Sequence, residues 1–156
     1  MSIDDDRDVF VTTMGDFLAS WNLPRATGRV YGRLLLNSGP VSLDALGEAL
    51  RLSKGAVSVA VRELVSWGLA RTIPQPGSRR LLIEAVGGFE QLLAASHERT
   101  RAFIRVLREG TRSAEDEKAT ARLSEVAEFF ESYVDAGEQM LRSRRSAPPG
   151  EGGVIR

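Results

Sequence analysis

The 156-residue sequence contains no cysteine and a single histidine. Without cysteine the chain cannot form disulfides, thiolate metal sites or iron–sulfur clusters, and thiol catalysis is excluded. Apolar runs such as Leu34–Leu36 fall far short of a membrane span, and the N-terminus is acidic where a signal peptide would be basic. We therefore expect a cytoplasmic protein with no membrane partner.

The formal net charge is zero, because 21 basic residues balance 21 acidic ones. The distribution is nevertheless uneven. Residues 25–80 hold nine basic and three acidic side chains, whereas residues 81–141 hold seven basic and twelve acidic ones. A basic middle segment is expected when one part of a protein faces nucleic-acid phosphates and the rest faces water or a partner subunit.

Hydrophobic residues recur at helical spacing in the first 36 residues. A first amphipathic helix is predicted over residues 3–22, with carboxylates placed where they favour a helix N-terminus. A second is predicted from Pro24 to Leu36, because proline suits a first helical turn and the following NSGP marks a stop. Gly28 and Gly32 lie four residues apart on it, a spacing that permits close packing against another helix.

Two short helices follow, joined by a turn. Ser42 is placed to cap the first and Ser53 the second, because a serine hydroxyl accepts a hydrogen bond from free backbone N–H groups at a helix start. In the second helix one face is apolar, formed by Ala56, Val57, Ala60, Val61 and Leu64. The other face is small, polar or basic, formed by Lys54, Gly55, Ser58, Val59 and Arg62. This pattern is typical of a helix-turn-helix.

The segments LARTI and RRLLIE predict two short strands, and PQPGS between them predicts a hairpin loop, or wing. PVS at residues 40–42 predicts a small third strand. The wing carries Ser78, Arg79 and Arg80, and strand alternation is expected to turn the two arginines to opposite faces.

Two long helices are predicted next, over residues 86–109 and from about residue 113. Their apolar stripes exceed what a small winged helix can cover, so we expect a subunit interface that also includes the first helix. The sequence thus predicts a mainly α protein with a small β wing. Its expected parts are an N-terminal dimerisation helix (1–24), a winged helix-turn-helix (25–85), a C-terminal helical dimerisation region (86–142) and a disordered tail (143–156).

With this order of elements, the chain resembles the MarR superfamily of bacterial transcriptional regulators, and within it the GbsR-like branch. The resemblance rests on LPRATGRVYGRLLL, VSLDALGEALRLSKGAVSVAVRELVSWGLA and PQPGSRR. It implies a homodimer that binds a double-stranded DNA operator, often under control of a small-molecule effector. It also implies DNA-binding residues, which are Ser53, Lys54, Gly55, Ser58, Val59 and Arg62 on the recognition helix and Ser78, Arg79 and Arg80 in the wing.

Within this set the expected roles differ. Arg62 is the candidate for reading a base, since an exposed arginine can pair bidentately with guanine, and a phosphate contact or a surface salt bridge is the alternative. Lys54 and Ser53 are expected to contact phosphate near the helix N-terminus. Family members often carry an acidic residue in the wing that is thought to orient a wing arginine, and this chain has Ser78 in that region instead.

Other classes of function find little support in the sequence. The chain lacks several features that catalysis commonly uses, since it has no cysteine, no glycine-rich phosphate loop and only one histidine. No catalytic residue, metal or cofactor is predicted. His97 is expected on a helix surface, with pH sensing across the dimer interface as the alternative. The competing hypothesis is a winged-helix protein interaction module without specific DNA binding, which a gel shift would distinguish.

Overall fold

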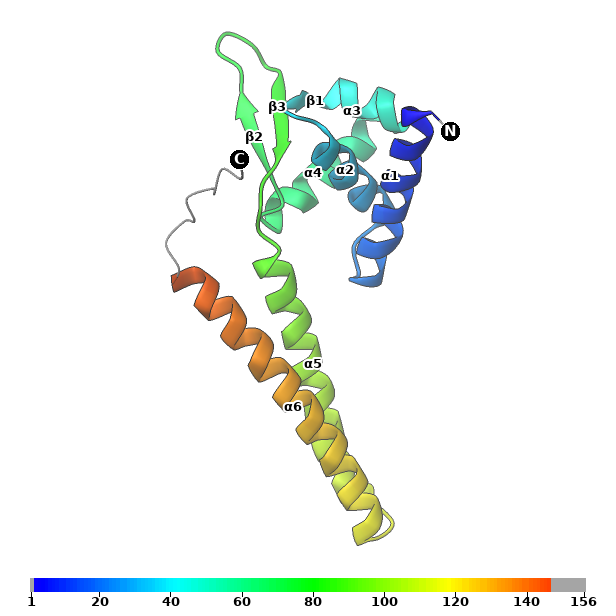
Figure 1. Ribbon diagram of the computed structural model, residues 1–156, viewed down its shortest axis with the longest axis vertical. Helices are drawn as coiled ribbons and strands as arrows, with labels where there is room; N and C mark the ends of the chain where they lie inside the picture. Colours follow the sequence, from blue (N-terminus) through cyan, green and yellow to red (C-terminus); the bar gives the residue numbers. More distant parts are fainter. Residues whose placement is uncertain (1, 147–156) are drawn as a thin grey trace, which may run out of the picture. The chain divides into compact units, whose positions relative to one another are not determined.

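The computed structural model describes residues 2–146, which form a mostly helical chain with one small antiparallel sheet (Figure 1). The elements in chain order are α1 (Ile3–Ser20), α2 (Arg25–Leu36), β1 (Val41–Ser42), α3 (Leu43–Leu50), α4 (Lys54–Ser66), β2 (Ala70–Pro74), β3 (Leu81–Ala85), α5 (Glu90–Gly110), a 3₁₀ turn (Thr111–Ser113) and α6 (Glu117–Ser146). None of the described helices has the length and apolar character to cross a membrane. The expected fold class is confirmed.

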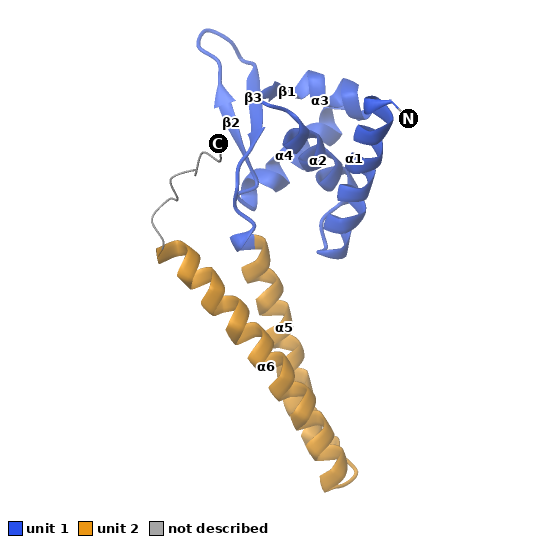
Figure 2. Ribbon diagram, viewed as in Figure 1, with its two compact units in different colours: residues 1–91 blue, residues 92–156 orange. Residues whose placement is uncertain are grey.

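The chain divides into two compact units, residues 1–91 and residues 92–156 (Figure 2). The first unit contains the helix-turn-helix, the sheet and also α1, while the second contains the long helices. The division falls within the first turn of α5. Of the predicted tail, residues 143–146 belong to α6, and residues 147–156 lie outside the described residues.

Serine hydroxyls cap the two helices of the helix-turn-helix, as the sequence predicts. The Ser42 Oγ accepts a hydrogen bond from the Ala45 amide at 3.1 Å, and the Ser53 Oγ accepts one from the Ala56 amide at 3.1 Å. Each bond satisfies an amide that has no partner inside its own helix. Because these contacts span three residues, local sequence is enough to place both helix starts.

Glycines allow α1 and α2 to approach closely. A Cβ atom added at Gly28 would lie 2.8 Å from the Cα of Gly15 on α1, and one added at Gly32 would lie 3.0 Å from the Met14 Cβ. The predicted close packing is therefore confirmed, and the partner is the first helix. α2 also reaches α3, because the Arg29 Nη2 donates to the Leu50 carbonyl at the end of α3 over 3.0 Å.

The core of the first unit forms beneath α4. Four of the five residues predicted on its apolar face are buried and Ala56 is half-buried, and this face packs with residues of α2, α3 and the sheet. The fully buried large side chains of this region are Val30, Leu46, Val57, Leu64, Leu69 and Ile83. Burial of this one face fixes the rotation of α4, so its opposite face must point to solvent.

The three strands form an antiparallel sheet in the order β1-β3-β2. The strand predicted to begin at Arg79 begins instead at Leu81, which pairs with Pro74 at the end of β2. Pro74 has no N–H to donate, and the following turn from Gln75 to Ser78 closes with Gly77 at φ +73. Arg79 and Arg80 therefore lie in the loop.

In the second unit α5 and α6 run antiparallel. The Arg101 guanidinium donates to both carboxylate oxygens of Glu138, at 3.0 and 2.7 Å, and Arg108 pairs with Glu131 at 3.0 Å. The bond from Arg101 holds the pKa of Glu138 below its usual value. Between the helices lies an apolar cluster, formed by Ile104, Leu107, Ala127, Phe130 and Val134.

Both long helices begin later than predicted. The two glycines before α5 interrupt the helical backbone, with Gly88 at φ +153, so the helix starts at Glu90. α6 starts at Glu117 because the Asp116 carboxylate accepts a hydrogen bond from the Ala119 amide at 2.8 Å. In sequence alone the carboxylates before Glu117 all look equally able to open a helix.

His97 is not a surface residue, which corrects the expectation from sequence. Only 8% of it is exposed, and a Cβ added at Gly137 of α6 would lie 2.8 Å from its Cε1 and Nε2 atoms. The imidazole thus fills the space that a glycine leaves on the facing helix. Helical periodicity could not predict this contact, since it joins residues forty positions apart in the sequence.

Candidate nucleic-acid interface

The solvent-facing side of α4 is formed by small residues and one arginine. Gly55, Val59 and Arg62 are exposed and Ser58 is half-buried. A Cβ added at Gly55 would meet nothing within 4 Å, so the helix backbone is open to a partner at that turn. Gly55, Ser58, Val59 and Arg62 therefore lie on one side of α4, as the sequence predicts.

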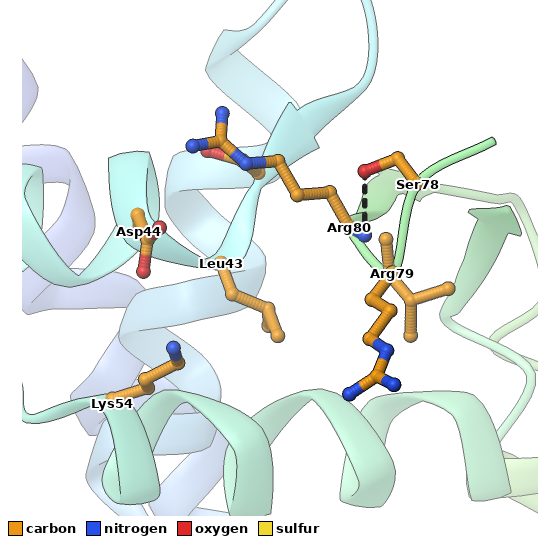
Figure 3. Close-up of a pocket in the computed structure, with 8 residues that line it drawn as sticks. Leu43, Asp44, Lys54, Ser78, Arg79 and Arg80 are labelled. Atoms are coloured by element: carbon orange, nitrogen blue, oxygen red, sulfur yellow. Dashed lines mark hydrogen bonds between the residues drawn. The ribbon is translucent and has the colours of Figure 1, made fainter. Parts of the chain in front are cut away.

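A cleft of about 430 Å³ lies between the start of α3, the start of α4 and the wing. Its lining residues are Ser42, Leu43, Asp44, Lys54, Ser78, Arg79, Arg80 and Leu81. Figure 3 shows Arg79 directed toward α4, whereas Arg80 extends toward the start of α3. The two arginines differ in direction, as expected, yet both border the same cleft, because they precede β3 and strand alternation does not apply to them.

A local hydrogen bond, between residues two positions apart, shapes the wing beside the cleft. The Ser78 Oγ accepts from the Arg80 amide at 3.0 Å (Figure 3), and the Ser78 amide donates to the Gln75 carbonyl at 3.1 Å. Ser78 thus organises the backbone that presents both arginines. It does so without an acidic side chain in the wing.

The basic residues of the first unit fall into two groups. Four are engaged with protein groups, since Arg7 pairs with Asp4, Arg25 pairs with Asp16, Arg71 pairs with Glu84 across the sheet, and Arg29 bonds to the Leu50 carbonyl. Within residues 2–146, no hydrogen bond or ion pair is made by the side chains of Lys54, Arg62, Arg79 and Arg80. The same holds for Arg33 and Arg51, but neither of these lines the cleft, whereas Lys54, Arg79 and Arg80 do and Arg62 lies on the outward side of α4.

Sequence reasoning missed four residues of the cleft, which are Ser42, Leu43, Asp44 and Leu81. In the sequence Ser42 is simply a helix cap, and Leu43 and Leu81 belong to apolar patterns. Asp44 has no sequence signal that separates it from any other carboxylate in a first helical turn. Only the folding of the wing beside α3 brings these residues to Lys54, Arg79 and Arg80.

Comparison with known proteins shows what this arrangement is similar to. The MarR family model matches residues 33–81, from the end of α2 to the start of β3. The HTH-type protein YvaV of Bacillus subtilis (strain 168) is 26% identical over 147 residues, which cover 84% of this chain and 83% of YvaV. Residues 33–81 are thus similar to the MarR family.

Further similarity extends beyond residues 33–81. The HTH-type transcriptional repressor OpcR of Bacillus subtilis (strain 168) is 25% identical over 140 residues, covering 79% of this chain and 76% of OpcR. The crystal structure of a transcriptional regulator matches with a TM-score of 0.63 at 23% identity, covering 91% of this chain and 99% of that one. The chain thus shares its fold with that solved structure, and both curated relatives carry names of HTH-type transcriptional regulators.

Proposed function

We propose that this protein is a sequence-specific, DNA-binding transcriptional regulator that acts as a homodimer. The observation that carries the proposal is the set of four unpaired cations, Lys54, Arg62, Arg79 and Arg80, on α4 and in the wing of a MarR-type winged helix. Unpaired cations on one surface attract the phosphate backbone, and their binding releases counterions from DNA. The family match is to a class of DNA-binding regulators, which supports the same role.

In this proposal α4 enters the major groove and the wing contacts the flanking backbone. α4 offers its small residues for close approach, and Arg62 lies in the outward face where it can reach base edges. Lys54 lies in the first turn of α4, beside Arg79 and Arg80 across the cleft. These three cations position the protein on phosphate, which fixes register without reading sequence.

We expect the variant Arg62→Ala to lose about 1–3 kcal/mol of binding free energy on a duplex selected from a random pool by the wild-type protein. Binding to unselected duplex should change little, because a bidentate contact to guanine is lost only where guanine is present. Fluorescence anisotropy on both duplexes measures the difference. Arg62→Lys is the matched control, since it keeps the charge but lacks the planar guanidinium fork that fits the guanine edge. Equal losses on both duplexes would reassign Arg62 to phosphate.

The homodimer rests on apolar side chains that the chain leaves exposed. On α6 these are Val126, Phe129, Tyr133 and Met140, on α5 Phe103 and Val106, and on α1 Ile3, Val9 and Phe17. The α6 set recurs at steps of three, four and seven residues, so it forms one stripe, as in helices that pair. Two-fold symmetry would present two copies of α4 to half-sites about 10 base pairs apart.

We expect light scattering to give the mass of a dimer at micromolar concentration, and Tyr133→Glu to shift the protein toward monomer. Tyr133 is 61% exposed, so a charge there should not disturb the fold of one chain but would be buried in the proposed interface. Ala121→Glu adds the same charge at an exposed position outside the stripe and should leave the dimer intact. A wild-type monomer at this concentration would contradict the proposal.

The finer assignments follow from the same resemblance. We assign the protein to the GbsR-like branch, acting in the cytoplasm as a repressor that responds to a small-molecule effector and has no catalytic role. The similarity to OpcR, which is named a repressor, supports the repressor role. A gel shift on random duplex at low and moderate salt tests DNA binding itself. No shift at either salt would favour a winged helix that contacts protein instead.

A further inference from the structure

Val59 is an apolar side chain in the middle of the DNA-facing side of α4. It is 56% exposed, although the other apolar residues at the centre of this helix, Val57, Val61 and Leu64, are nearly fully buried. At about 100° per residue, Gly55 and Arg62 lie within roughly 60° of Val59 around the helix. An exposed β-branched residue therefore stands between an open glycine turn and the arginine proposed to read a base.

The surroundings of Val59 leave its two methyl groups accessible. Gly55, one turn earlier, has no side chain, and a Cβ built there would contact nothing within 4 Å. A flat partner could thus approach the helix backbone at this turn and reach the valine at van der Waals distance. Because valine can neither donate nor accept a hydrogen bond, the group that it recognises must itself be apolar.

We infer that Val59 reads the C5-methyl group of a thymine, and this inference rests on the proposed function. In the major groove of unmodified DNA the edges of the base pairs present hydrogen-bonding atoms and a single apolar group, the thymine methyl. Cations flank Val59, with Arg62 on the same face and Lys54 at the start of the same helix, so a polyanion is the partner that the local charge favours.

The geometry also limits where the thymine lies. Residues 59 and 62 are about 4.5 Å apart along the helix axis, at about 1.5 Å per residue, which is close to the rise of roughly 3.4 Å between base pairs. The thymine read by Val59 therefore neighbours the base pair read by Arg62. Each half-site should contain one such thymine, giving two in a symmetric operator.

The test removes one methyl group at a time from the DNA. A duplex is first selected from a random pool by the wild-type protein, and each thymine in one half-site is then replaced singly by deoxyuridine. We expect deoxyuridine at one position to weaken wild-type binding about fourfold, because the burial of one methyl group on binding is lost. Val59→Ala should bind the selected duplex more weakly by a similar factor and should be insensitive to deoxyuridine at that position. Val59→Ile, which keeps a branched apolar side chain, should retain the sensitivity.

Two results would overturn the inference in distinguishable ways. In the first, the wild-type protein prefers the selected duplex, but every deoxyuridine substitution that weakens its binding also weakens the binding of Val59→Ala. Val59 then does not read a methyl group, and the proposed function stands. If selection enriches no sequence, both the inference and sequence-specific binding fail. Circular dichroism of Val59→Ala checks its helix content, which should be unchanged because the residue is exposed and alanine favours helix.

Discussion

Replacing Lys54, Arg79 and Arg80 together by alanine is expected to weaken binding to selected and random duplexes by similar factors. These side chains line one cleft and make no ion pair within residues 2–146, so their charges are available to phosphate. Each lost phosphate contact should lower affinity about tenfold near 0.1 M salt, and the slope of log affinity against log salt should fall by about 2–3 per subunit. Because phosphate contacts carry no sequence information, preference should persist.

The measurement is anisotropy on both duplexes across a salt series. Arg25→Ala is the matched control, because Arg25 is exposed and basic but is paired with Asp16 at 3.0 Å and does not line the cleft. Asp44 is the acidic residue among the described residues that line the cleft. Asp44→Asn removes its negative charge and should strengthen binding to both duplexes. An unchanged slope in the triple variant would show that the cleft does not contact phosphate. A loss confined to A·T-rich flanks would show that the wing reads the minor groove.

Gly28→Ala is expected to lower the free energy of unfolding by about 1–3 kcal/mol, the usual cost of overpacking. The added Cβ would lie 2.8 Å from the Gly15 Cα and 2.8 Å from the Met14 carbonyl oxygen, both of which are backbone atoms of α1. Backbone cannot rotate away as a long side chain can, so α1 and α2 must separate. Separation would also expose apolar residues at this crossing, including Val11 and Leu18.

Gly55→Ala is the matched control, as it makes the same change in another helix. A Cβ at Gly55 meets nothing within 4 Å, so the substitution should be neutral or stabilise the fold by about 0.5–1 kcal/mol through the higher helix propensity of alanine. Denaturant unfolding of both variants at one fixed protein concentration gives the comparison. Equal stability of Gly28→Ala and the wild type would mean that the two helices do not meet at these glycines.

The candidate interface could be predicted from the sequence wherever the signal is local. Lys54 and Arg62 belong to the outward face of α4 because the apolar residues of that helix define the buried face, and Ser53 caps it through a contact three residues along. The wing turn follows in the same way from Pro76 and Gly77, whose backbone preferences require few neighbours. Whether these residues bind DNA stays a prediction.

The sequence by itself determined the winged helix, since caps, turn residues and hydrophobic period act within a few positions of the chain. Tertiary structure decided which charges remain available, because Arg29 and Arg71 are engaged by groups at least 13 residues away and Asp44 joins the cleft only when the wing folds beside α3. It also decided that His97 is buried against Gly137. Such contacts depend on how elements distant in sequence pack, and no local pattern encodes which side chain will meet which.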